Sequence, residues 1–262
     1  MTIIEVVKNS FKEYKTNFKS SVSLVFLFYA LPFVITSLIG YGFAGYSFYE
    51  NGINVFSSGQ LWVWYALAIV SLLLNLLGYF SLIGGAMDGD GFSMSSALEK
   101  GKKIYVKGVG VSIWMLVVFA IPILLTSLVL LFSQASWVSW ILGLLIFSFI
   151  ILIYWSMAFC SLVDRDEGVI GALQGSAQMI RGNWWRTLLY AVVFLVISYV
   201  VIFINGLVFS LLILLTNSIF ANSVNAFLIV AIGLSLLESI VVNFVVIPLS
   251  AFYIKNYYQA LK

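Results

Sequence analysis

The sequence contains no histidine and a single cysteine, Cys160. Histidine is the commonest metal ligand and the commonest general base at neutral pH, so its absence argues against a zinc site, a haem site and a Ser-His-Asp triad. A single cysteine excludes an intrachain disulfide. We therefore expect no cofactor, no bound metal and no enzymatic activity.

Charged residues are also scarce: they make up 9% of the 262 residues, whereas hydrophobic residues make up 63%. Soluble domains are nearer a quarter charged and half apolar. A water-soluble fold of this length would leave much of that apolar surface in contact with solvent. The composition predicts an integral membrane protein. The net charge is only +3, and we expect membrane lipids, not nucleic acid, as partners.

Six apolar runs are long enough to cross a bilayer, which takes about twenty residues. They show no alternation of period two, which disfavours a β-barrel. The prediction is an all-α polytopic protein that forms one membrane domain over residues 1–262. The six predicted spans are Ser21–Phe43, Leu61–Met87, Val109–Phe132, Val138–Val163, Thr187–Leu215 and Ala226–Phe252.

All 13 basic residues fall on one side of this six-span topology. The positive-inside rule makes that side cytoplasmic. Both termini of this cell-membrane protein are then cytoplasmic, together with the segments Asp88–Lys107 and Asp164–Arg186. The opposite loops are predicted at Ala44–Gln60, Ser133–Trp137 and Asn217–Asn225.

The three cytoplasmic segments carry apolar residues at helical spacing but are too short and too polar to span. We predict an amphipathic helix in the membrane plane before each odd-numbered span. The apolar stripes are Ile3, Val7, Phe11, Tyr14 and Phe18 in the first segment, Met94, Leu98, Gly101 and Tyr105 in the second, and Ile170, Leu173, Ala177, Ile180 and Trp184 in the third.

Short motifs recur along the chain. KTNF at 15–18 resembles RGNW at 181–184, and LPFVITSLI at 31–39 resembles IPILLTSLV at 121–129. Pro32 and Pro122 lie midway through odd-numbered spans, where each removes a backbone donor that neighbours must replace. We predict three parallel repeats, approximately 1–87, 88–163 and 164–262, packed as a compact six-helix bundle with pseudo-threefold character.

The stretch RGNWWR at 181–186 is interpreted as the corner where the third in-plane helix turns into the membrane. Gly182 and Asn183 tolerate the backbone angles of a helix break. Trp184 and Trp185 suit the headgroup layer, and Arg181 and Arg186 suit lipid phosphates. We interpret the stretch as interfacial lipid anchoring; a role in substrate binding is the alternative.

Two acidic turns, MDGDG and VDRDEG, follow the second and fourth spans. Asp88, Asp90, Asp164 and Asp166 are predicted to cap the in-plane helices that follow. The alternative is a divalent-cation site near lipid phosphates.

Glu238 is the only charged residue inside a predicted span. A carboxylate at that depth costs roughly 2.5–3.5 kcal/mol on insertion scales, so it should face other helices and bind a polar group. Asn205 lies at similar depth and is the first predicted partner, with Asn75 second. Asn243 lies on the small-residue face of the same helix. This candidate polar site is either a clamp between helices or a proton or substrate site.

Three segments together, SFKEYKTNF, ALEKGKK and DEGVIGALQGSAQMIRGNWWR, resemble a broad prokaryotic membrane family. The family includes the membrane domain fused to some glycerophosphoryl diester phosphodiesterases, and stand-alone six-helix proteins. The resemblance implies a helical membrane module. It does not imply phosphodiesterase activity, because that chemistry belongs to a separate soluble barrel domain rich in histidine and carboxylates.

Two functional hypotheses follow. The first is a non-enzymatic membrane module that organises lipid or binds a membrane partner, including a second copy of itself. The second is a permease for a small solute or a lipid that uses a polar site around Glu238.

Overall fold

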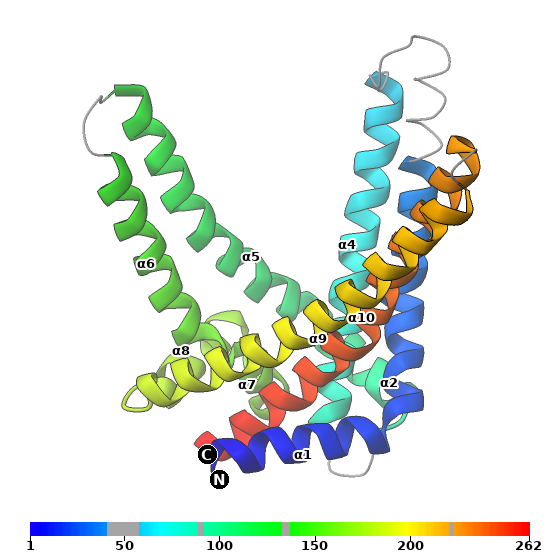
Figure 1. Ribbon diagram of the computed structural model, residues 1–262. Helices are drawn as coiled ribbons and strands as arrows, with labels where there is room; N and C mark the ends of the chain where they lie inside the picture. The colour runs from blue at the N-terminus through cyan, green and yellow to red at the C-terminus, as the bar shows by residue number, and fades with distance from the viewer. Residues whose placement is uncertain (41–57, 89–91, 133–136, 221–222) are drawn as a thin grey trace.

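The computed structural model describes residues 1–40, 58–88, 92–132, 137–220 and 223–262, and all of their regular structure is helical. Three helical hairpins rise from a common base (Figure 1). The first contains α2 (Phe18–Val25), the π-helical turn η1 (Phe26–Ala30), helical residues 31–40 and α4 (Ser58–Ala86). The second contains α5 (Met94–Phe132) and α6 (Trp137–Trp155), and the third contains α9 (Trp184–Ile219) and α10 (Val224–Leu261).

Five helical segments among the described residues are long and apolar enough to cross a membrane: Phe18–Gly40, Gly59–Ala86, Ile146–Arg165, Trp184–Ile219 and Ala226–Leu261. They coincide with five of the six predicted spans. The other predicted span, Val109–Phe132, is the helical second part of α5. The all-α membrane class is therefore supported. The predicted loops Ala44–Gln60 and Ser133–Trp137 lie almost entirely outside the described residues.

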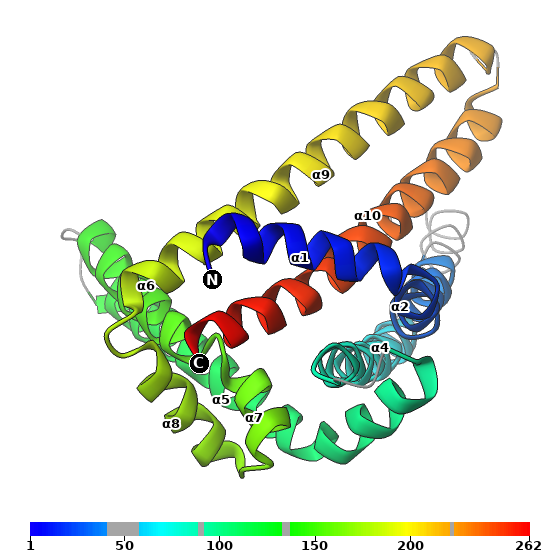
Figure 2. The ribbon, with the colours of Figure 1, turned by 90° about the horizontal axis from the view of Figure 1, so that it is seen from below.

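The base consists of α1 (Ile3–Thr16), α7 (Ala158–Arg165), α8 (Val169–Ile180), the first part of α5 and the end of α10. Both chain termini lie there (Figure 2). All 13 basic residues belong to these elements, to the residues that adjoin them, or to the first turns of α2 and α9. The base is thus the basic end of the molecule, as the charge pattern predicts for one side of the membrane.

The main hydrophobic core also lies at the base. Its fully buried side chains come from segments far apart in the sequence, such as Val6 of α1, Leu82 of α4 and Tyr258 of α10. Full burial of one such side chain contributes about 1.5–3 kcal/mol. Packing at the base therefore fixes where the hairpins begin.

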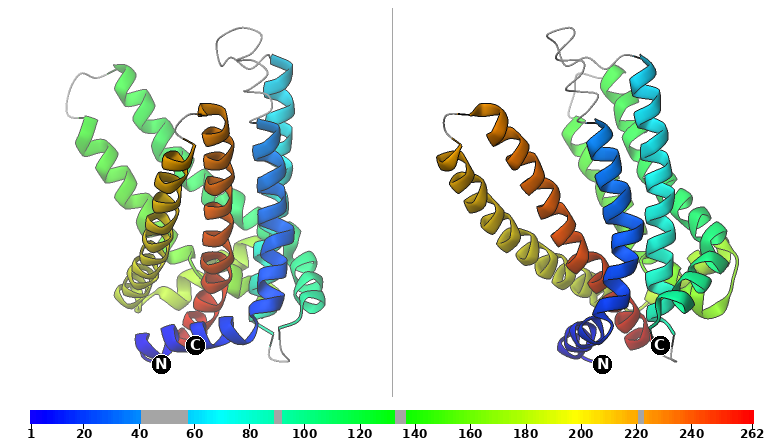
Figure 3. Two further views of the ribbon diagram at one scale, coloured as in Figure 1. Left: turned by 45° about the vertical axis from the view of Figure 1, so that its right-hand side comes forward. Right: turned by 90° about the vertical axis from the view of Figure 1, so that its right-hand side faces the viewer.

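Above the base the hairpins diverge (Figures 1 and 3). α9 buries four of its 36 residues, Thr187, Tyr190, Phe209 and Thr216. The predicted compact bundle is therefore wrong above the base. A hydropathy pattern does not distinguish lipid from a neighbouring helix, since lipid tails are as apolar as leucine.

The first and third in-plane helices are separate elements, whereas the second is not. α1 ends before Asn17 and α8 ends before Arg181, and α2 and α9 begin after Asn17 and Asn183. The two asparagines have similar backbone angles, φ −103° and ψ 18° at Asn17 and φ −115° and ψ 17° at Asn183. By contrast, α5 runs without a break from Met94 to Phe132. The KTNF and RGNW motifs thus form similar corners, while the second segment continues into its span.

The chain has three prolines, and each lies inside a helix, where it leaves the carbonyl four residues earlier without its usual N–H donor. Pro248 lies in α10, and the hydroxyl of Tyr14 in α1 donates to the freed carbonyl of Phe244 at 3.0 Å. Pro32 frees the carbonyl of Phe28 in the same way.

In each of the first two hairpins, a side chain of the same hairpin donates to the carbonyl that proline leaves without its N–H donor. The amide nitrogen of Asn75, in the orientation that lets it donate, lies 2.5 Å from the carbonyl oxygen of Phe28 and 3.3 Å from that of Ser71. Pro122 frees the carbonyl of Val118, which accepts from the hydroxyl of Ser148 at 3.5 Å. Side chains from neighbouring helices therefore replace the donors that the prolines remove, as membrane helices require.

Candidate functional site

The corner at 181–186 has the predicted geometry. Arg181 follows the last residue of α8, Gly182 has a positive φ of 95°, and Trp184 is the first residue of α9. A side chain on Gly182 would meet nothing within 4 Å, so the backbone angle, not space, favours glycine. The prediction of a helix break at this stretch is confirmed.

The four predicted lipid contacts at this corner divide into two pairs. Trp185 is 77% exposed and Arg181 is exposed. Trp184 instead packs against the core of the base. Arg186 donates to the carbonyl of Met1 at 2.6 Å and lies over the ring of Tyr190. Trp184 and Arg186 thus hold the base together, and Trp185 and Arg181 remain available to lipid.

The predicted aspartate caps are wrong for α8. Gly168 occupies its N-cap position and no side chain caps it. Asp166 lies two residues earlier in the left-handed conformation that ends α7, with φ 51°. Its carboxylate pairs with Lys107 at 2.9 Å and Lys103 at 3.1 Å, so it joins α7 to α5.

The other aspartates also form bonds within the base. Asp164 accepts from the hydroxyl of Tyr258 at 2.9 Å and pairs with Lys262. Asp88 pairs with Lys100 at 2.8 Å. Asp90 lies outside the described residues. No group of three or more histidine, cysteine, aspartate or glutamate side chains placed to hold a metal occurs among the described residues.

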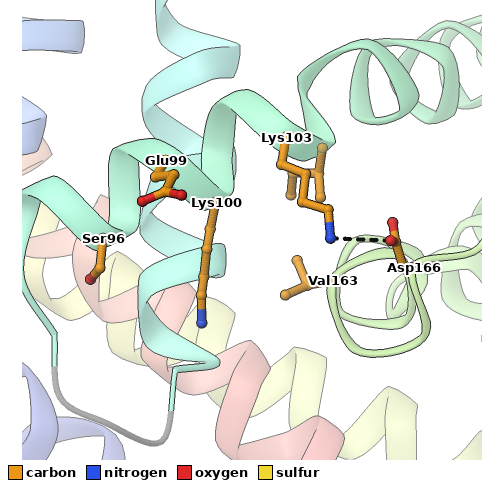
Figure 4. Close-up of a pocket in the computed structure, with 7 residues that line it drawn as sticks. Ser96, Glu99, Lys100, Lys103, Val163 and Asp166 are labelled. Carbon is orange, nitrogen blue, oxygen red and sulfur yellow. Dashed lines mark ion pairs between the residues drawn. The ribbon is translucent and has the colours of Figure 1, made fainter.

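A cavity of about 450 Å³ separates the first part of α5 from the end of α7 (Figure 4). Ile104 and Val163 give it apolar walls, and its charged lining carries both signs. The polar residues that line it are Ser96, Glu99, Lys100, Lys103 and Asp166. Hydrogen bonds from Lys107 and Lys103 lower the pKa of Asp166. The cavity suits a small charged or zwitterionic group. Sequence analysis missed it because its two walls are about 60 residues apart.

Sequence analysis also did not assign a role to Ser176. The predicted fourth span is broken between α6 and α7 at Ser156 and Met157. The buried Ser176 hydroxyl accepts from the N–H of Met157 at 3.1 Å and donates to the carbonyl of Tyr154 at 2.7 Å. The hydroxyl of Ser176 in α8 therefore forms a hydrogen bond with a main-chain group on each side of the break.

Within the third hairpin, Asn205 lies next to Glu238 as predicted, but it bonds to the main chain of Glu238 and not to its carboxylate. Its amide donates to the main-chain carbonyl of Glu238 at 3.3 Å. Glu238 is half-buried, and its Oε1 lies 3.5 Å from the point where a side chain on Gly206 would begin. Among the described residues, the carboxylate has no hydrogen-bond or ion-pair partner.

The other two residues of the predicted polar site are not brought together with Glu238. Asn75 bonds to the first hairpin at Phe28. Asn243 is half-buried on α10 and has no side-chain hydrogen bond with the part of the chain that the structure describes. The intramembrane site therefore reduces to Glu238, Gly206 and Asn205. No protein-family model, curated protein or solved structure matches the chain, so the family resemblance stays a prediction.

Proposed function

We propose that the chain is a six-span protein of the cell membrane with both termini and the base in the cytoplasm. Five candidate spans support this topology, together with the helical run 109–132 as the sixth. The gathering of every basic residue near the base supports the orientation. In this topology each of the three hairpins enters from the cytoplasmic side, and the first and third begin with similar corners.

Cysteine labelling tests the topology. Single cysteines replace Lys102 at the base and Ser223 at the start of α10, in a Cys160→Ala background. An impermeant maleimide should label Ser223→Cys in intact cells and label Lys102→Cys only after lysis. Labelling of Lys102→Cys in intact cells would overturn the orientation.

We further propose that this module is non-enzymatic and holds lipid between its diverging hairpins. The observation that carries the proposal is the divergence itself, which leaves most side chains of α9 exposed, among them Leu195, Leu207 and Leu211. In a membrane such surfaces contact acyl chains or a partner helix. The carboxylates Asp164 and Asp166 form bonds with the base, which supports a structural role and not acid–base chemistry.

Photo-crosslinking distinguishes lipid from a partner. A photoreactive residue is placed at Leu211 on α9 or at Leu124 on α5, both about 60% exposed, and the same residue at Lys102 is the control. Crosslinks from both span positions should be to phospholipid, in a fixed ratio to protein after detergent washing. A crosslink to a second protein band would overturn the lipid proposal in favour of partner binding or self-association.

The permease remains the second candidate because of one observation: the carboxylate of Glu238 lies beside Gly206 and has no partner among the described residues. Intramembrane carboxylates are costly and commonly belong to transport sites. Liposomes that contain the purified chain should then show solute or lipid flux that Glu238→Gln abolishes while the thermal transition is unchanged. Flux that survives the substitution, or the lack of any flux, would reject a transport site at this residue.

A further inference from the structure

Helix α1 is held firmly by one of its faces. Its first turn carries a capping box, in which the side chains of Thr2 and Glu5 each accept a hydrogen bond from the other's backbone N–H. Along the helix, Val6 and Ser10 are fully buried. Glu13 pairs with Lys255 of α10 at 2.7 Å. The face that remains exposed is therefore presented in a fixed direction.

The exposed side of α1 also carries Glu5, Lys12 and Thr16, and along one line of it apolar and basic residues alternate. Ile4, Lys8, Phe11 and Lys15 are all exposed, with exposed fractions of 74% at Ile4 and 42% at Phe11. Steps of four, three and four residues place the four side chains on one face of the helix. Neither lysine bonds to any other described residue. We call these four residues the α1 stripe.

We propose that the α1 stripe docks on the anionic lipid surface of the membrane. Apolar side chains enter the boundary between headgroups and acyl chains, while lysines extend to phosphates and anionic headgroups. Two lysines near an anionic surface favour the docked state by on the order of 30-fold. Asn17 alone separates α1 from α2, so the stripe stays close to the level at which the first span enters the membrane.

Charge decides between lipid and a second copy of the chain. Ile4 and Phe11 are seven residues apart, a spacing that also occurs in paired helices. A second copy of the stripe, however, offers no carboxylate to these lysines, and in a parallel pair each lysine would face a lysine, which is unfavourable. An anionic surface complements the stripe without such repulsion. The inference goes beyond the proposed function, since it concerns the headgroup surface at the base and not the space between the hairpins.

The test uses the full chain in a Cys160→Ala background with a nitroxide on Phe11→Cys. The protein is reconstituted in phosphatidylcholine, with or without phosphatidylglycerol, and collisions with a water-soluble nickel complex are measured. Phosphatidylglycerol should lower the nickel accessibility of the label severalfold. A label on Lys102→Cys, which is exposed on α5, should change little.

Charge variants complete the test. Lys8→Gln or Lys15→Gln should each reduce the effect of phosphatidylglycerol at position 11, whereas Lys102→Gln should not. Equal accessibility in the two lipids would overturn the proposal. Protection that appears in phosphatidylcholine and grows with the protein-to-lipid ratio would also overturn it, because that result indicates contact between copies.

Discussion

Leu82 and Leu211 both lie in long membrane helices, but Leu82 is fully buried beside the base and Leu211 is 60% exposed on the third hairpin. The base joins segments from both ends of the chain, such as α1 with α10 and Asp164 with Tyr258. The hairpins above it join mainly sequence neighbours, as in α9 with α10. The tertiary structure is therefore fixed at the base, and the upper halves of the hairpins depend mainly on contacts between the two helices of each hairpin.

The sharpest test of this difference is a pair of glycine substitutions. A methyl group on Gly101 in α5 would collide with the hydroxyl oxygen of Ser81 and lie 2.8 Å from its Cα, whereas one on Gly233 in α10 would meet nothing within 4 Å. Gly101→Ala should lower the free energy of unfolding by about 1–3 kcal/mol through overpacking. Gly233→Ala should leave it unchanged or raise it by up to about 1 kcal/mol through helix propensity.

Unfolding in mixed micelles with increasing denaturing detergent measures both variants. If the two substitutions had equal effects, the base would not be packed more tightly than the hairpins.

The sequence predicted the parts of this structure that depend on local chemistry. Apolar runs predicted membrane helices, and Gly182 with Asn183 predicted the break before α9. Both predictions depend only on local properties, the hydropathy of a segment and the backbone angles that its residues tolerate. The sequence could not predict that the hairpins diverge, since a leucine that faces lipid and one that faces a helix have similar transfer energies.

The candidate site shows the same limit. Similar depth predicted that Asn205 lies near Glu238, but not that its amide bonds to the main chain. Asp166 was predicted to cap the next helix, whereas Lys103 and Lys107 from a distant segment hold it. The sequence does not distinguish Ser176 from other small helical residues, because its role depends on contact with the α6–α7 break, which only the structure shows.

The next largest effect is expected at the carbonyl of Phe244. Pro248 leaves this carbonyl without its usual N–H donor, and the hydroxyl of Tyr14 in α1 donates to it instead. Burial raises the pKa of this hydroxyl. Tyr14→Phe removes that donor and should cost about 1 kcal/mol. Tyr199 on α9 is 66% exposed, and Tyr199→Phe is the matched control with no expected change. Thermal unfolding in one detergent compares the two; equal shifts would argue against a stabilising bond from Tyr14 to the carbonyl of Phe244.

A smaller effect is expected inside the third hairpin. Asn205→Leu removes the bond to the carbonyl of Glu238 and should cost about 0.6 kcal/mol, the average for hydrogen bonds between membrane helices. Glu238→Gln keeps the main chain and changes a carboxylate that has no partner among the described residues, so stability should change less than with Asn205→Leu. If Glu238→Gln were the more destabilising variant, the carboxylate would have a partner in the membrane that holds the hairpin.

The smallest expected effect concerns Asp166, which is exposed and joins α7 to α5 across the charged cavity. Lys107 and Lys103 lower the pKa of its carboxyl group in the folded chain. A lowered folded pKa means that the ion pairs stabilise the fold fully above the ordinary aspartate pKa of about 4, and that this stabilisation is lost as the pH falls through the folded pKa. Asp166→Asn keeps a side chain that tolerates the left-handed backbone but removes the charge. The variant should be slightly less stable than the parent at pH 7, and the difference should shrink with added salt and vanish at acidic pH. Unfolding midpoints of both chains across this pH range measure the effect; a difference that persists at the acidic end would assign it to packing or backbone strain instead of charge.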